Sequence, residues 1–439
     1  MVEVDSILKD AQKRGAQEAE VISETSMFKY VKVTPGGQNQ AILGENTRYA
    51  LRAVVDGAVG FAYFTGNVED AVKGAISLAK GKEKSERWRF FISDRPAHHL
   101  NLYRKSVEDI PIEQVITDLE VTCEATEDEK ITASNAGCQL VCSTVEIANT
   151  SGVHRQESRS FTSLWVNCRA ADADYGMGYS YKYSLQYDFD FLGIGNQVKH
   201  HALHQLGKQK TEPGKKMVIL APRVFSNLLV SAALPSFLGN NVLRQRSALH
   251  LGRKVASDHL AIVENPLVES PQGRSFDDEG VPSTTVTLVD NVRVQNFLYD
   301  TYCGETTASG SRYAQYHGRS LRYVPRPCAT SLSVTGESAS LDTLISETKD
   351  GLLVIDETNA HASQQQTGLF SIAVTGGFII KNGEISAPVK RCMVSGLAFE
   401  DLLPNVVQLS NKRELHRSFV YPTYVETGHV LVDSLRITA

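Results

Sequence analysis

Two-residue turns set between strand-forming runs restrict the fold of this chain more than any other feature of the sequence. Each turn combines Asp or Asn with Gly or Asn, residues that tolerate the positive φ angles of tight hairpins. The turns are Asp56-Gly57 between Tyr49–Val55 and Ala58–Phe64, Asp290-Asn291 within Val286–Tyr299, and Asn382-Gly383 within Phe378–Val389. Antiparallel β-hairpins are therefore predicted near both ends of the chain.

The order of the expected elements predicts an α+β protein of more than one domain. At 439 residues the chain exceeds the ~250–300 residues at which single cores stop growing. Residues 1–83 are predicted to form an N-terminal module of helices and strands, followed by a charged, aperiodic connector over 84–110. A helix and an antiparallel meander are predicted over 111–213, and a larger, mostly antiparallel β domain with a few helices over 214–439.

Charge and hydropathy exclude several classes of function. A net charge of −5 and a pI near 6.2 lack the basic excess of a nucleic-acid binder, so nucleic acid is not expected as a partner. No run of ~18 apolar residues could span a membrane, and the charged start Met1–Ala11 does not resemble a signal peptide. A cytoplasmic location is therefore expected, with no membrane contact.

The seven cysteines do not form a recognisable motif. Their number is odd and no CxxC pair occurs, which disfavours a disulfide framework or a zinc knuckle. Cys138 and Cys142 fall on one face of an expected strand, where apolar packing is the commoner role of a thiol. Cys303 and Cys392 are weak candidates for nucleophiles, since the sequence shows no histidine partner for either.

A series of aromatic residues marks the end of the meander. All of them occupy odd positions, so an extended chain would present every ring on one face. They are Tyr175, Tyr179, Tyr181, Tyr183, Tyr187, Phe189 and Phe191. One hypothesis is an aromatic wall that faces a peptide or a partner. The other, which aromatic packing in cores favours, is a sheet face packed on a neighbouring helix or domain.

Two clusters are candidates for metal binding. His200, His201 and His204 lie on an expected helix over 196–209, but a catalytic zinc normally needs three protein ligands and no carboxylate or thiol accompanies them. A solvated or capping helix face is favoured. The cluster Asp277, Asp278 and Glu279 lacks the spacing of a calcium loop, which favours a solvated turn.

Standard catalytic motifs are missing from the sequence. It contains no GxxxxGK[ST] loop, no GxSxG elbow and no HExxH pair. The reactions that depend on those spacings therefore have no support here.

Long stretches of the sequence resemble the TldD/PmbA family, also called modulators of gyrase. The stretches are MVILAPRVFSNLLVSAALPSFLGNN at 217–241, FDDEGVPSTTVTLVDNVRVQNFLYDTYCG at 276–304, Gly351–Glu357, GGFIIKNGEISAPVKRCMVSG at 376–396, and ALRAVVDGAVGFAYF at 50–64. The resemblance covers nearly the whole chain, is loose in the middle region and is best in the last region, 214–439.

The resemblance implies a subunit that has lost the family's metal site. Catalytic members carry HExxxH, with two zinc-binding histidines and a general-base glutamate, on the helix after the strand that resembles Met217–Leu220. Here Val230 and Pro235 take the histidine positions and Ser231 the glutamate position. Neither Val nor Pro can bind zinc, and Ser cannot replace the carboxylate base. The tail 417–428, where catalytic members supply a cysteine ligand, contains none.

This pattern is similar to that of the TldE (PmbA) type of subunit. It implies no cofactor in this chain, a heterodimer with a zinc-containing TldD-type subunit, and peptide substrates that are unfolded or short, in peptide maturation and proteolysis. The isolated chain is inactive on this hypothesis, and the sequence leaves open whether it forms a homodimer. The alternatives are a stand-alone hydrolase or peptidase, and a regulatory binding protein.

Overall fold

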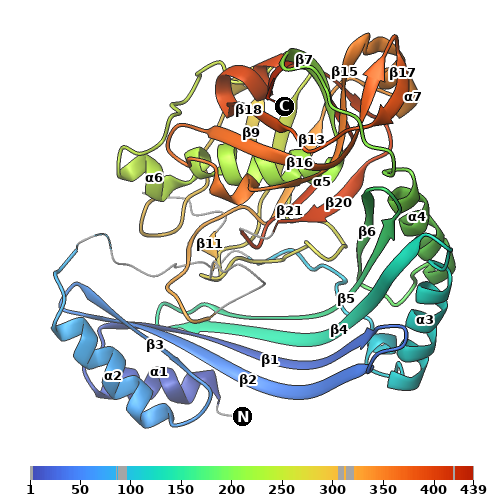
Figure 1. The fold of residues 1–439 in the computed structure, drawn as a ribbon. Helices are drawn as coiled ribbons and strands as arrows, with labels where there is room; N and C mark the ends of the chain where they lie inside the picture. The colour runs from blue at the N-terminus through green and yellow to red at the C-terminus, as the bar shows by residue number, and fades with distance from the viewer. Residues whose placement is uncertain are drawn as a thin grey trace.

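The computed structural model describes residues 3–85, 87, 96–304, 311–312, 321–418 and 421–438. The predicted α+β class is confirmed. A long curved sheet forms the N-terminal half, and two further sheets enclose a helical segment in the C-terminal half (Figure 1). None of the helices in these ranges is long and apolar enough to cross a lipid bilayer.

The N-terminal half is built on a single six-stranded antiparallel sheet with the order β3-β2-β1-β4-β5-β6. Its strands are β1 (Glu18–Val33), β2 (Gln40–Val55), β3 (Ala58–Phe64), β4 (Ile131–Asn149), β5 (His154–Ala171) and β6 (Tyr175–Ser184). The ranges 1–83 and 111–213 therefore share one sheet through the β1–β4 pair. The domain boundaries themselves stay a prediction, and residues 86 and 88–95 of the connector lie outside the described residues.

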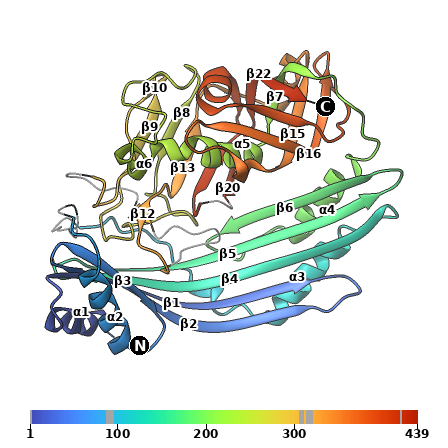
Figure 2. The same ribbon diagram turned by 60° about the vertical axis from the view of Figure 1, so that its left-hand side comes forward.

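Two pairs of helices cover opposite ends of one face of this sheet (Figure 2). Helices α1 (Val4–Lys13) and α2 (Val68–Lys80) pack against Ala19 and Val21 of β1. Helices α3 (Ile112–Glu124) and α4 (Phe191–Leu203) share a core with Val31 and Val33 of the same strand. These four β1 residues occupy odd positions, so they project from one face. The even-numbered face, which carries Ile22, is turned toward the C-terminal half.

The helix that carries the histidines begins earlier than predicted. We expected it over 196–209, with the strand-like pattern continuing to Phe191, but β6 ends at Ser184 and α4 runs from Phe191 to Leu203. Asp190 provides the N-cap, because its Oδ1 accepts a hydrogen bond from the Gly193 amide at 2.9 Å. The cap overrides the alternating pattern that precedes it.

The C-terminal half contains an eight-stranded and a six-stranded sheet. In the larger one, the pairings β7–β15–β16–β18–β22–β7 form a closed circuit. Its strands are β7 (Gly214–Leu220), β14 (Ser338–Ala339), β15 (Asp350–Thr358), β16 (Leu369–Lys381), β17 (Glu384–Pro388), β18 (Met393–Leu397), β19 (Val406–Ser410) and β22 (Val430–Thr438). The smaller sheet contains β8 (Ala261–Glu264), β9 (Val286–Asp290), β10 (Arg293–Val294), β13 (Ser331–Thr335), β20 (Glu414–Arg417) and β21 (Tyr424–Thr427).

The predicted hairpins are present in all three places. Asp56 and Gly57 join β2 to β3 with φ angles of 50° and 76°, and Asn382-Gly383 joins β16 to β17. The β9–β10 turn lies one residue later than expected, at Asn291 and Val292. A β-branched residue rarely adopts a φ of 63°, so composition could not have placed this turn on Val292.

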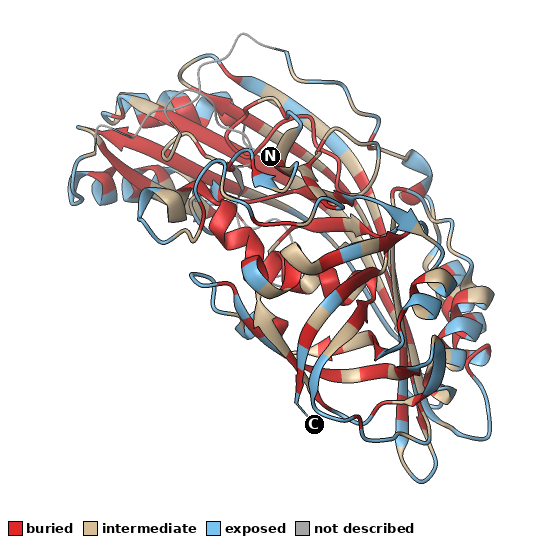
Figure 3. Cartoon of the chain, turned by 90° about the horizontal axis from the view of Figure 1, so that it is seen from above, coloured by how far each residue is buried: buried red, intermediate tan, exposed pale blue. Residues whose placement is uncertain are grey.

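An apolar helical segment forms the centre of the C-terminal half. The helix that the resemblance implies after Met217–Leu220 is observed as α5 (Pro222–Leu228), followed by a π-helical turn (Leu229–Ala233) and a 3-10 turn (Leu234–Phe237). Nearly every residue of this segment is buried, and buried residues run through the interior of both halves (Figure 3). A helix that is apolar on all sides belongs inside a core.

The acidic cluster is also buried, so the predicted solvated turn is wrong. Asp277, Asp278 and Glu279 are 6%, 0% and 1% exposed. Arg274 pairs with Asp278 at 2.6 Å, and Arg52 of β2 pairs with Glu279 at 2.9 Å. Buried carboxylates need such partners, because water no longer solvates them. The sequence could not show this pairing, since Arg52 and Glu279 are 227 residues apart.

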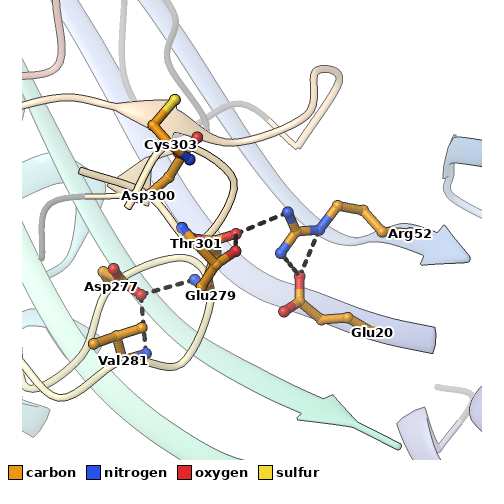
Figure 4. Close-up of polar contacts among 8 residues, drawn as sticks. All are labelled: Glu20, Arg52, Asp277, Glu279, Val281, Asp300, Thr301 and Cys303. Atoms are coloured by element: carbon orange, nitrogen blue, oxygen red, sulfur yellow. Dashed lines mark hydrogen bonds and ion pairs between the residues drawn. The ribbon is translucent and has the colours of Figure 1, made fainter. Parts of the chain in front are cut away.

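Arg52 joins the two halves of the molecule (Figure 4). Its Nε donates to Glu20 Oε1 on the neighbouring strand at 2.8 Å, while its Nη1 donates to Glu279 Oε1 of the C-terminal half at 2.9 Å. Thr301 donates to the same Glu279 carboxylate from its amide and its hydroxyl, at 2.9 and 2.6 Å. One guanidinium is therefore shared between carboxylates from two halves.

One arginine cannot neutralise every carboxylate of this junction. Burial raises the pKa of Glu20 to about 7, and repulsion from Glu279 adds to the shift, while Arg52 opposes it. Burial and the Glu279 charge also raise the pKa of Asp300 to about 6, and burial raises that of Asp277 well above its ordinary value. The folded protein therefore retains protons here that the unfolded chain releases.

We predict that Glu20 lowers the stability of the protein as the pH rises. Its folded pKa of about 7 lies above the ordinary value of 4.5, so the folded state binds more protons between these pH values, and the free energy of unfolding falls as the pH rises through them. Glu20→Gln removes this titration but keeps an oxygen acceptor for Arg52. Between pH 5 and 8 the variant should gain up to ~3 kcal/mol relative to the parent, measured by urea unfolding.

The exposed Asp172, which pairs with Lys130 on the surface, provides the control. The free energy of unfolding of Asp172→Asn should change with pH as that of the parent does. If the free energies of unfolding of Glu20→Gln and the parent differ by the same amount at every pH, Glu20 is ionised throughout this pH range and the prediction is wrong.

Candidate functional site

The residues at the degenerate motif positions lie in the buried central segment. Val230 and Ser231 belong to the π-helical turn and are 0% and 2% exposed, and Pro235 is buried in the 3-10 turn. Helix α5 packs against β20 and β21, which belong to the tail region 414–427. The helix that leads directly into the motif positions thus lies beside the tail strands.

Ser231 alone of these three residues lines a cavity. The cavity measures about 180 Å³ and is also lined by Arg223, Asn227 and Glu357. Val230 instead belongs to the apolar core, and Pro235 is buried away from the cavity lining. The Ser231 Oγ has no hydrogen-bond partner among the described residues. The position that the resemblance assigns to the general base of catalytic members therefore holds an unpaired hydroxyl at the wall of a polar cavity.

Two other polar side chains of the cavity, Asn227 and Glu357, are held by hydrogen bonds. Asn227 Nδ2 donates to Glu357 Oε1 at 2.8 Å, and the Ala360 amide donates to Glu357 Oε2 at 3.1 Å. Burial raises the pKa of Glu357 above its ordinary value, although both hydrogen bonds oppose the shift. Asn359, which directly precedes the 3-10 turn Ala360–Ala362, adopts a left-handed φ of 81°. The cavity presents hydroxyl, amide and carboxyl groups in fixed positions.

Arg223 connects this cavity to the N-terminal sheet. Its guanidinium lies 4.1 Å from the centre of the Tyr179 ring and 5.7 Å from that of Tyr181, and it pairs with Asp356 at 3.1 Å. A guanidinium between aromatic faces and a carboxylate is held by cation–π attraction as well as by charge. Strand β6 is thereby fixed beside α5 and β15.

The aromatic series divides into three groups, so it does not form one wall. Tyr179, Tyr181 and Tyr183 face the C-terminal half, where Tyr183 packs edge-on against Tyr424. This agrees with a sheet face packed on a neighbouring domain. The other groups are the exposed Tyr175 and, beyond the end of β6, the mutually packed Tyr187, Phe189 and Phe191.

The opposite face of β6 explains this arrangement. A Cβ atom at Gly176 or Gly178 would lie 1.9 Å from backbone oxygens of α4. The glycines at even positions thus admit the helix closely, and the tyrosines at odd positions must project toward the C-terminal half.

The donor set at the degenerate motif does not fit zinc. Zinc is bound by thiolate, imidazole or carboxylate groups, and Val230, Ser231 and Pro235 supply none of these. Among the residues that the structure describes, no group of three or more His, Cys, Asp and Glu side chains is placed to hold a metal ion. The tail region contributes β20, β21 and no cysteine, and residues 419–420 of it lie outside the described part.

The three histidines of α4 do not converge. The rings of His200 and His204 are stacked 3.7 Å apart, and His204 Nδ1 lies 2.9 Å from the His200 carbonyl oxygen. The ring of His201 lies 6.3 Å from that of His200, on the side of Glu414. Burial lowers the pKa values of His200 and His201. The geometry is that of a histidine stack that caps the end of a helix.

The cysteines are placed for packing. Cys138 and Cys142 belong to the core under α3 and α4, as predicted. Burial raises the pKa of Cys392 to about 11, and burial with the Asp300 charge raises that of Cys303 further. Thiols with raised pKa values are poor nucleophiles at neutral pH.

Sequence reasoning did not identify Arg223, Asn227 or Glu357 as site residues. The available signal was a carboxylate at the end of an apolar strand, since Glu357 follows the run 352–355. The hydrogen bond from Asn227 spans 130 residues, so their proximity could not be read from spacing.

Comparisons with known proteins identify similar chains. Models of the PmbA/TldA metallopeptidase C-terminal and central domains match residues 213–439 and 105–206. An uncharacterized protein of Methanocaldococcus jannaschii is 24% identical over 446 residues, which cover 98% of this chain and 100% of that protein. A metalloprotease PmbA homolog of Haemophilus influenzae is 27% identical over 248 residues, 56% of this chain and 51% of that protein. TldE from Thermococcus kodakarensis shares the fold, with a TM-score of 0.86 and 17% identity over 99% of both chains.

Proposed function

This chain belongs to the PmbA/TldD metallopeptidase family, and from this premise we propose that it is the metal-less subunit of a two-subunit zinc peptidase. The partner subunit carries the HExxxH motif and the zinc ion, and this chain completes the cleft that holds the peptide. The shared fold with TldE of T. kodakarensis and the similarity to a zinc metalloprotease TldD homolog of Saccharolobus solfataricus support the proposal.

The observation that carries the proposal is a preserved scaffold without metal-binding side chains. Helix α5 still packs against the tail strands β20 and β21, but Val230 and Pro235 are buried as packing residues. A scaffold that keeps its packing while it loses its ligands is suited to assembly and substrate binding rather than to hydrolysis.

The cavity beside Ser231 gives this subunit groups for binding a peptide. The Ser231 hydroxyl is free to bond a peptide amide or carbonyl group, whereas both oxygens of Glu357 already accept hydrogen bonds. Glu357 is therefore held as an acceptor and is not poised to activate water. Location in the cytoplasm and action on unfolded or short peptides are parts of the same proposal.

The isolated subunit should contain no stoichiometric zinc. We expect far less than one zinc per chain by elemental analysis after purification without chelator, because the motif positions offer no ligand. The copurified pair should contain about one zinc per heterodimer, with a mass by light scattering equal to one copy of each subunit. One zinc per isolated chain, lost on His204→Ala, would instead assign a metal site to α4.

Replacing Ser231 should leave catalysis intact. Ser231→Ala removes no proton-transfer group, so the peptide-cleavage rate of the reconstituted pair at saturating peptide should stay within about twofold of the parent, whereas loss of a general base costs about 100-fold. Changing the partner's HExxxH glutamate to glutamine provides the matched control and should abolish cleavage. A 100-fold loss in Ser231→Ala, with the heterodimer still assembled, would make this subunit catalytic and overturn the proposal.

A further inference from the structure

A second, larger pocket lies at the junction of the two halves, away from Ser231. It measures about 500 Å³ and is lined by four basic side chains, although the whole chain has a net charge of −5. Its charged and aromatic lining consists of Asp174, Tyr175, Lys208, Lys210, Lys390 and Arg391. Four cations around one carboxylate create a local positive potential, which a pocket wall of low dielectric strengthens.

Two extended segments position the lysines on one side of this pocket. The segment between α4 and β7 is bonded to the segment after β17, since the Gln209 amide donates to the Pro388 carbonyl at 2.8 Å and the Lys390 amide donates to the Gln209 carbonyl at 2.7 Å. Val389, opposite Gln209, is buried at 2% exposure. Side chains alternate in extended chains, so Lys208, Lys210 and Lys390 project to the other side, into the pocket.

The pocket's own acid, Asp174, offsets only part of the charge of the lysines, since it is one carboxylate among four cations of the described lining. Asp174 accepts hydrogen bonds from the Gly207 and Lys208 amides at 3.1 and 2.8 Å, which hold its pKa below the ordinary value. None of the four cationic side chains lies within 4.0 Å of a described carboxylate oxygen in an ion pair. Like charges held together on one rim repel one another until an anion reaches them.

An aromatic ring stands beside these charges. Tyr175 is 52% exposed, and its ring centre lies 4.4 Å from the Lys208 ammonium and 5.4 Å from the Arg169 guanidinium. The ring offers a flat apolar surface for a neighbouring side chain of a ligand.

We propose that this pocket binds an acidic segment of a peptide, with carboxylates on the lysines and an apolar side chain on Tyr175. The inference rests on the proposed function, which makes peptides the substrates of the assembled enzyme. Three of the four cations are ammonium groups spread along two extended segments, an arrangement that matches carboxylates spaced along a chain. Among the described residues, the pocket lining includes no helix N-terminus or glycine-rich loop that would converge on a single phosphate.

The pocket is connected to the cavity beside Ser231. Thr375, in the pocket lining, donates to Asp356 Oδ2 at 2.7 Å, and Asp356 pairs with Arg223, which lines the cavity. Three side chains in contact, Thr375, Asp356 and Arg223, thus link the wall of the pocket to the cavity that Ser231 lines.

Binding of a fluorescently labelled hexapeptide with Glu, Asp and Phe residues to the isolated chain tests this inference by anisotropy. The Gln and Asn version of the same peptide should bind at least tenfold more weakly, and affinity for the acidic peptide should fall as salt increases. Lys208→Gln, Lys210→Gln and Lys390→Gln combined should weaken binding at least tenfold. The exposed lysines Lys9, Lys80 and Lys349, changed to glutamine together, form the control and should leave it unchanged.

The single variant Lys210→Glu tests the same point without disturbing the fold, because this side chain is exposed. It should also weaken binding of the acidic peptide, and its melting temperature should equal that of the parent. Equal affinity for the acidic and neutral peptides would overturn the inference, as would lysine-dependent binding of tripolyphosphate without binding of the acidic peptide. If the reconstituted pair cleaves peptides but acidic ones do not bind, the pocket assignment fails alone. If no heterodimer forms while the lysines still bind acidic peptide, the proposed function fails alone.

Discussion

The guanidinium of Arg52 sets the relation between the two halves of this molecule. It is almost fully buried and is shared between Glu20 of the N-terminal sheet and Glu279 of the C-terminal half. Removing the arginine from such a buried set leaves uncompensated carboxylates, and breaking a buried ion pair in this way typically costs ~3–5 kcal/mol. The sheet must therefore present its even-numbered face to the C-terminal half at this point.

At the far end of the same sheet, β6 is fixed by the contact of Tyr179 with Arg223. Both pockets lie near this second contact, so their shape depends on how the halves are joined.

Local features of the fold could be predicted because they depend on neighbouring residues. The Asp56-Gly57 and Asn382-Gly383 hairpins need only backbone angles that Asp, Asn and Gly adopt easily. The start of α4 was misplaced because an aspartate cap, Asp190, ended an alternating pattern that otherwise indicated a strand. Capping is a local signal too, but it was outweighed by the aromatic periodicity.

The site could be predicted only in part, because its contacts join distant residues. The positions Val230, Ser231 and Pro235 came from resemblance, and the structure places them in the buried centre of the C-terminal half. The cavity itself depends on the Asn227–Glu357 bond, and the neutralisation of Glu279 depends on Arg52, across 130 and 227 residues. Composition alone favoured a solvated acidic turn, since unpaired carboxylates usually remain in water.

The three positions of the degenerate motif differ in their surroundings. Val230 and Pro235 add apolar contacts to a core that needs no polar group there, so their replacement by metal ligands would bury unsatisfied imidazoles unless a metal bound them. Ser231 is different, because a buried hydroxyl without a partner costs ~1–3 kcal/mol. That cost is removed when water or a polar group of a ligand occupies the adjoining cavity, and about 180 Å³ is ample for either. The serine position therefore favours an occupied cavity, whereas the valine and proline positions favour a closed core, and the same short segment serves both stability and binding.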